Sequence, residues 1–140
     1  MDGFPMVRLL CGLAAIAAPV TALAAETKLA ATLVGANEPA GGDAKGKGTF
    51  SAVIDADAGD FCYTLTANGI GKPTAAHVHS GAAGADGAPV ITIEVADDEC
   101  RAVDPALLKQ IVAAPASYYV NVHSAAFPAG AIRGQLETAK

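Results

Sequence analysis

Residues 49–67, TFSAVIDADAGDFCYTLTA, largely alternate apolar and polar side chains on both sides of a short polar turn. Apolar residues occupy every second position of residues 50–54, and they do so again in residues 61–65. A period of two is typical of a half-buried β-strand. Residues 57–60, Asp-Ala-Gly-Asp, have the composition of a tight turn. This part of the sequence therefore predicts a β-hairpin with one apolar face.

Short runs of similar composition lie on both sides of the hairpin, and stretches rich in Gly and Pro separate them. Such a series of short strands predicts an all-β fold, an antiparallel sandwich or barrel. We expect the acidic residues 97–99 to form a turn between two of these strands. The expected strands, about seven in all, are residues 27–34, 50–54, 61–67, 75–79, 89–96, 117–124 and 131–138.

One segment, near residues 104–114, has the pattern of a helix instead. Asp104 is a favourable N-cap residue, and Pro105 suits the first helical position. Residues 107–112 then place apolar side chains at helical spacing, and Pro115 ends the pattern. We therefore expect one short helix within an otherwise all-β chain.

The first residues of the chain have the layout of a secretory signal peptide. Arg8 supplies an early positive charge, residues 9–18 are mainly apolar, and Ala22-Leu23-Ala24 is a small-residue cleavage pattern. The apolar run is shorter than the roughly 20 residues that span a bilayer. We predict a signal peptide over residues 1–24 and a single domain over residues 25–140, located in a periplasm or outside the cell.

The charge and hydropathy of the remaining chain argue against two classes of partner. The formal net charge is -5 and no basic cluster is present, which disfavours nucleic acids and anionic membrane surfaces. No second apolar segment is long enough to enter a membrane once the signal is removed. The remaining expectation for a partner is an unknown protein or a small ligand.

The chain has three cysteines, of which Cys11 lies in the expected signal peptide. The remaining pair, Cys62 and Cys100, predicts a disulfide in an oxidising compartment. A metal site built on these two thiols is the alternative, but they lack the close C-x-x-C spacing of such sites. A covalent link would also help a domain whose core consists largely of small side chains.

The three histidines of the chain are the candidate functional residues. His77 and His79 are two residues apart, so on a strand both side chains project from the same face. His123 ends the segment Tyr-Val-Asn-Val-His, in which the valines can face the core while the histidine faces outward. If the two strands are neighbours, three imidazoles meet on one outer wall, and neutral imidazole suits copper and zinc. The alternative is that each histidine is a separate surface residue.

Several segments around these histidines resemble the CHRD (chordin-like) domain family. The family is named for repeats in chordin, an extracellular antagonist of bone morphogenetic proteins, and it includes single-domain secreted bacterial proteins, which this chain resembles more. The resemblance covers about residues 27–136 and implies an extracytoplasmic β-sandwich, without a settled biochemical activity. The segments that carry it are AHVHSGAAG at 76–84, PV at 89–90, YYVNVHS at 118–124, FP at 127–128, Gly130 and IRGQL at 132–136.

The sequence is also similar, more distantly, to copper–zinc superoxide dismutase. That family carries a His-Val-His strand that binds copper on the outside of a Greek-key β-barrel, a further copper ligand on a later strand, and an arginine that guides the anion. The similarity implies copper ligation by His77, His79 and His123, and it gives Arg133 either an anion-guiding or a structural role. No fourth histidine is available as a bridging ligand. A zinc site of that family's kind is therefore excluded.

Together these observations predict an antiparallel Greek-key β-sandwich or barrel, Ig-like or superoxide-dismutase-like, with one short helix. We predict a non-enzymatic extracytoplasmic binding module with a three-histidine copper site and no catalytic residues. One alternative is a copper-dependent, dismutase-like redox enzyme. Another is a structural or adhesive domain without metal. A serine hydrolase is disfavoured because the chain lacks the G-x-S-x-G nucleophile motif.

Overall fold

The computed structural model describes residues 25–140, and the expected signal peptide lies outside the described residues. The predicted hairpin is confirmed: strands β2 (Lys47–Asp55) and β3 (Asp60–Asn68) pair antiparallel along their whole length. Their inward side chains begin the core, where the ring of Phe61 packs 5.4 Å from that of Tyr63 between centroids. The period-two pattern therefore marks the buried face correctly.

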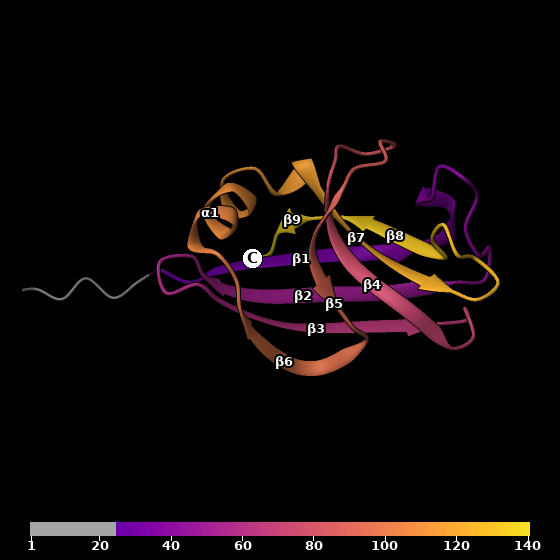
Figure 1. Cartoon of the computed structure of the whole chain (residues 1–140), viewed down its shortest axis with the longest axis horizontal. Coiled ribbons are helices and arrows are strands. Elements are labelled where there is room, and N and C mark those ends of the chain that lie inside the picture. The colour runs from indigo at the N-terminus through magenta and orange to yellow at the C-terminus, as the bar shows by residue number, and fades with distance from the viewer. Residues whose placement is uncertain (1–24) are drawn as a thin grey trace, which may run out of the picture.

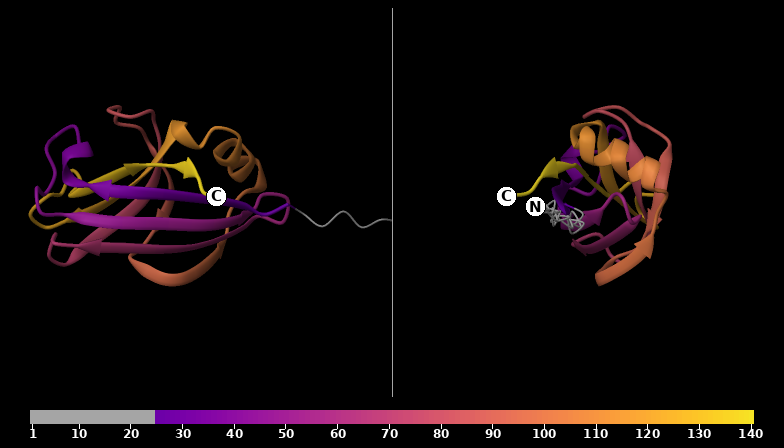
Figure 2. Two further views of the ribbon diagram at one scale, coloured as in Figure 1. Left: turned by 180° about the vertical axis from the view of Figure 1, so that it is seen from behind. Right: turned by 90° about the vertical axis from the view of Figure 1, so that its left-hand side faces the viewer.

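The strands form one antiparallel sheet with the order β5-β4-β7-β8-β1-β2-β3-β6, and β9 pairs with β1. Figures 1 and 2 show that this sheet curls around its apolar face into a half-barrel. The predicted all-β sandwich or barrel with one helix is confirmed. The other strands are β1 (Thr27–Val34), β4 (Pro73–Ser80), β5 (Pro89–Ile93), β6 (Ala96–Ala102), β7 (Tyr118–Ser124), β8 (Ile132–Gln135) and β9 (Glu137–Thr138).

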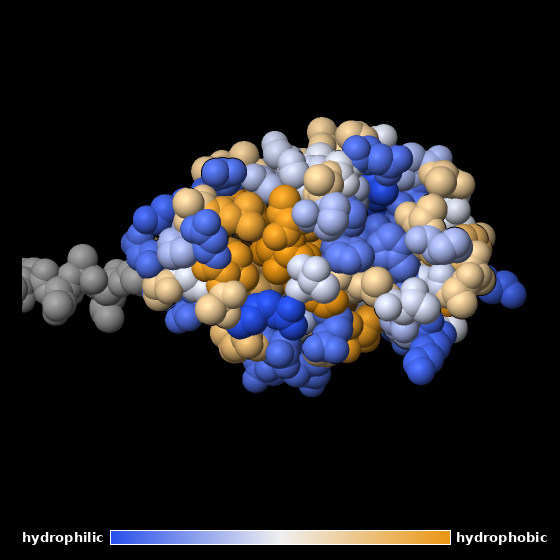
Figure 3. Space-filling view, viewed as in Figure 1, coloured by the Kyte–Doolittle hydropathy of each residue, from blue (hydrophilic) through white to orange (hydrophobic). Residues whose placement is uncertain are grey.

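The predicted helix is α1 (Pro105–Ala113), and Asp104 caps it by accepting a hydrogen bond from the backbone N–H of Ala106 at 2.8 Å. Leu108 and Ile111 of this helix are fully buried against the core. On the face shown in Figure 3, the most hydrophobic surface lies between α1 and β5. None of the helices in the described part of the chain is long and apolar enough to cross a membrane.

Three expectations about the strands were wrong. The expected strand at 89–96 ends at Ile93, and Ala96 begins the separate strand β6. The acidic residues 97–99 lie within β6 and not in a turn between strands. Glu99 pairs with β3, whereas Asp97 and Asp98 lie where the register shifts, and the backbone of Asp98 is left-handed with a φ of +55°. The Thr64 hydroxyl donates to Asp97 and accepts from the backbone N–H of Asp98, which holds this irregular part of the strand on β3. The expected strand at 131–138 is split into β8 and β9, and β8 pairs with β7 and β1 whereas β9 pairs with β1 alone. The described chain also has two short 3-10 helices, Gly35–Asn37 and Pro115–Ser117.

The predicted disulfide is confirmed: Cys62 of β3 and Cys100 of β6 are directly opposite each other and bonded. The bond fastens the edge strand β6 to β3, the neighbouring strand of the hairpin. With a sequence separation of 38 residues, the closed loop should stabilise the fold by about 3–4 kcal/mol in the chain-entropy description.

Replacing both Cys62 and Cys100 by Ala should therefore lower the free energy of unfolding by about 3–4 kcal/mol, because the unfolded chain regains loop entropy. Urea denaturation followed by circular dichroism measures the effect. The double variant avoids a free thiol, and the wild-type protein under reducing conditions provides a second comparison. An unchanged urea midpoint would show that the bond contributes nothing to the stability of the fold.

Candidate metal centre

The pairing of β4 with β7 places the histidines on one wall. The strands are antiparallel neighbours, with His77 opposite Asn121 and His79 opposite Tyr119. Val78 of β4 and the valines of β7 point into the core and are fully buried. The three histidines therefore project from the opposite, outer face, as their spacing predicts.

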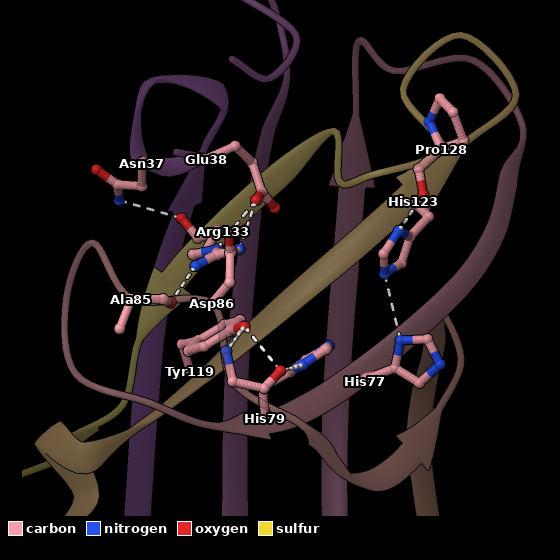
Figure 4. A network of polar contacts seen from close by, with 11 residues as sticks. Asn37, Glu38, His77, His79, Ala85, Asp86, Tyr119, His123, Pro128 and Arg133 are labelled. Carbon is pink, nitrogen blue, oxygen red and sulfur yellow. Dashed lines mark hydrogen bonds and ion pairs between the residues drawn. The ribbon is translucent and has the colours of Figure 1, made fainter. Parts of the chain in front are cut away.

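The three imidazoles converge closely enough to share an ion. Each offers one ring nitrogen, and these atoms all lie within 4.8 Å of one another. The Nδ1 atom of His77 lies 3.3 Å from Nε2 of His123, and Figure 4 shows both rings on the same wall as His79. Two nitrogens that each bind one tetrahedral ion at 2.0–2.1 Å are about 3.3 Å apart. The group can therefore hold a metal ion.

Backbone carbonyls fix the proton positions of two of the rings. Nδ1 of His79 lies 2.8 Å from the carbonyl oxygen of Gly87, and Nδ1 of His123 lies 2.9 Å from that of Pro128. A carbonyl oxygen can only accept, so both Nδ1 atoms carry the proton and the ring lone pair of each histidine lies on Nε2. In the metal-free protein, His77 then donates its Nδ1–H to Nε2 of His123. An ion can bind through this pair of nitrogens only if His77 changes to its Nε2–H tautomer, which frees the Nδ1 lone pair. Metal-binding histidines commonly donate their second N–H to a carbonyl in this way.

One ring nitrogen of the cluster is buried without a hydrogen-bond partner. Nε2 of His79 is buried and has no hydrogen-bond partner. Leaving a buried polar atom unpaired costs about 1–3 kcal/mol. A cation at the centre of the cluster would satisfy this atom, and a set of three imidazole nitrogens is a donor set that copper and zinc accept. The residues present therefore fit a metal ion.

The surroundings of His77 favour its neutral form. Burial lowers the pKa of His77 below 6.5, and the positive charges that His123 and His79 carry when protonated lower it further, while Asn121 opposes the change. Only the neutral imidazole can bind a metal ion. The lowered pKa therefore favours the neutral imidazole of His77 at neutral pH, the form that a metal ion would need.

The guanidinium of Arg133 on β8 lies beside this wall but is already paired. Its Nη2 atom lies 2.9 Å from Oε2 of Glu38 and 2.8 Å from Oδ1 of Asp86, and its Nη1 atom donates to the carbonyl of Ala85 at 2.8 Å. Burial raises the pKa of Glu38, and the charge of Arg133 opposes that rise. The arginine thus joins two loops that are far apart in the sequence.

Sequence reasoning missed three residues around the histidines. Glu38 comes from the loop after β1, and no pattern links it to Arg133. Tyr119 stacks on His79 with centroids 4.7 Å apart. Its position on the same face of the expected strand as His123 could have indicated that it lies beside the histidines. An added Cβ at Gly87 would overlap the carbonyl oxygen of Ser80, so only glycine fits there. In sequence it looks like any other loop glycine.

These features define a class: a disulfide-linked, curled antiparallel β-domain whose outer wall carries a three-histidine cluster. Residues 29–136 match the CHRD domain, and the chain belongs to the CHRD domain family. The family resemblance seen in the sequence is therefore confirmed over nearly all of the described residues. No curated protein and no solved structure matches the chain.

Replacing Gly87 by Ala should displace the loop that carries the carbonyl partner of His79, because the new methyl group overlaps the Ser80 carbonyl. We expect the ¹⁵N NMR signals of the His79 ring to lose the pattern of a single Nδ1–H tautomer. Gly84→Ala, in the same loop, is the matched control: its φ of +81° adds left-handed strain of about 1–2 kcal/mol, but no atom lies within 4 Å of the new methyl. Equal ring spectra in both variants would contradict this account.

The lowered pKa of His77 also predicts a pH-dependent stability of the metal-free protein. The unfolded chain binds a proton at His77 near pH 6.5, whereas the folded chain does so only at lower pH. The free energy of unfolding should therefore fall as the pH drops below about 6.5. Urea titrations with a chelator between about pH 8 and pH 5 measure this. The variant His77→Gln should show a flatter dependence, and an identical slope would contradict the assignment.

Proposed function

We propose that the protein is a non-enzymatic, extracytoplasmic binding module that holds copper through His77, His79 and His123. The observation that carries the proposal is the convergence of three ring nitrogens, two of which are held in their ligand tautomer by backbone carbonyls. Among divalent metals, copper binds nitrogen donors most tightly. The cluster thus has the donor set and the preorganisation of a copper site.

Two findings support a place outside the cytoplasm. The chain belongs to the CHRD family, which suggests an extracellular binding module. The disulfide between Cys62 and Cys100 fits an oxidising compartment. Residues 1–24 would supply the export signal, and residues 25–140 would be the mature single domain. The partner would be a protein or a small ligand outside the cytoplasm.

Binding is better supported than dismutase-like catalysis. His77 and His123 are partly exposed, so an ion at the cluster would be accessible to a small external ligand under either reading. A dismutase-like enzyme would need Arg133 to attract the anion, but this guanidinium is only 4% exposed and is paired with two carboxylates. We therefore propose a structural role for Arg133 rather than an anion-guiding one.

Metal analysis of untagged protein purified from the periplasm tests the proposal. We expect one copper per chain in the wild-type protein and loss of that copper in His79→Ala, because the variant lacks one of three ligands. A loss of copper in this variant can be assigned to the cluster, because the chain has only these three histidines and no other imidazole can bind copper.

The same preparations separate the alternatives. Copper-loaded protein should show no superoxide turnover, and turnover would favour the redox enzyme instead. Copper content that is unchanged in each of the three His→Ala variants would contradict the site and leave a structural or adhesive domain.

A further inference from the structure

We infer that Arg133 is the positioning residue for His79, the most buried histidine of the cluster. Its guanidinium holds the loop whose carbonyl orients the His79 ring, and it also lies on the aromatic ring that stacks against His79. This inference rests on the proposed copper site, because it assigns a means by which one ligand is kept in place. Two independent sets of contacts carry it.

The first set of contacts runs through three successive loop residues. Arg133 donates from Nη1 to the carbonyl of Ala85 and from Nη2 to the carboxylate of Asp86, each at 2.8 Å. The next residue, Gly87, accepts the Nδ1–H of His79 at 2.8 Å. The guanidinium therefore fixes the two residues directly before the carbonyl that sets the tautomer and orientation of the His79 ring (Figure 4).

The second set of contacts is a stack of side chains. The Cζ atom of Arg133 lies 4.0 Å from the centre of the Tyr119 ring. That ring is nearly parallel to the His79 imidazole, with 7° between the planes and 4.7 Å between centroids. The hydroxyl of Tyr119 also accepts a hydrogen bond from the backbone N–H of Gly87 at 3.1 Å. Arg133 thus limits the movement of the ring on which His79 rests.

The arginine itself is anchored from a distant part of the chain. Its Nε atom donates to Oε2 of Glu38 at 3.0 Å, and its Nη2 atom lies 2.9 Å from the same oxygen. The side chains of Glu38 and Arg133 are 1% and 4% exposed, so water does not weaken this pair much. A lysine could not replace Arg133, because one ammonium cannot reproduce these several directed donors.

These contacts predict a measurable effect on the metal. Residues that orient a metal ligand without touching the ion typically change affinity 10- to 100-fold when mutated. We therefore expect Arg133→Met to weaken Cu(II) binding by roughly 10- to 100-fold in a competition titration. Its electron paramagnetic resonance spectrum should also show an altered copper hyperfine splitting, because the His79 ring is no longer held in one orientation.

The chain offers a matched control in Arg101. This arginine also lies over a tyrosine, with its Cζ atom 5.6 Å from the ring centre of Tyr63, and it pairs with Glu94 and Glu99 at 3.8 Å. Arg101 also donates to the backbone carbonyl of Thr92 on β5, but it makes no hydrogen bond or ion pair with any of the three histidines in the described structure. Arg101→Met should therefore keep the copper affinity and spectrum of the wild-type protein, which separates a specific effect of Arg133 from the general effect of losing an arginine with its ion pairs and its tyrosine contact.

Two further measurements keep the test decisive. Asp86→Ala removes one loop contact at a side chain that is 71% exposed, so this variant folds even if Arg133→Met does not, and it should change the copper spectrum in the same direction. In metal-free protein, ¹⁵N NMR should show His79 as the Nδ1–H tautomer in the wild type and as a mixture in Arg133→Met. Wild-type copper affinity, spectrum and tautomer in both variants would overturn the inference. Loss of the tautomer in a protein whose wild type binds no copper would overturn the proposed function while supporting the positioning role.

Discussion

The candidate centre depends on the register between β4 and β7. Side chains alternate along a strand, so a slip of one residue would turn every histidine of one strand toward the core. Buried valines prevent such a slip: Val78 lies opposite Val120, and both are almost fully buried. The free energy that holds the histidines together therefore comes mainly from apolar contacts on the other face of the sheet, and the cluster itself need not stabilise the fold.

The outer face of the β4–β7–β8 part of the sheet carries buried polar groups, not only solvent-exposed ones. Loops cover part of it, and beneath them lie a buried ion pair, Glu38 with Arg133, and a buried amide, Asn121. Removing charges from water is costly, and paired buried ions often contribute little net stability. The buried ion pair is better explained by its positional role, because Arg133 holds the loop at residues 85–86 by hydrogen bonds and lies on the ring of Tyr119. The unpaired Nε2 of His79 lies within this ordered polar layer.

The half-barrel leaves two edge strands, β5 and β6, whose unpaired backbone groups could pair with another chain. The acidic side chains of β6 oppose such pairing, and the Cys62–Cys100 bond holds this strand against β3. The part of the sheet that stabilises the domain and the part that carries the candidate metal centre are therefore different. The hairpin and disulfide side stabilises the domain, whereas the β4–β7 wall and its loops, including residues 81–87, form the candidate centre of this CHRD protein.

Local patterns in the sequence determined the hairpin, the helix and the outward direction of the three histidines, because strand and helix periods are properties of neighbouring residues. The disulfide partners followed from the cysteine count, because only Cys62 and Cys100 remain once Cys11 is assigned to the signal peptide. Patterns failed for the acidic residues of β6, because their place in the sheet depends on an irregular pairing with β3, a strand distant in the sequence. The contact between Glu38 and Arg133 joins residues 95 positions apart, and the partnership of Gly87 with His79 needs a loop folded back onto its own strand. Only the tertiary structure decided these, because directed polar contacts between loops depend on the path of the whole chain and leave no period in the sequence.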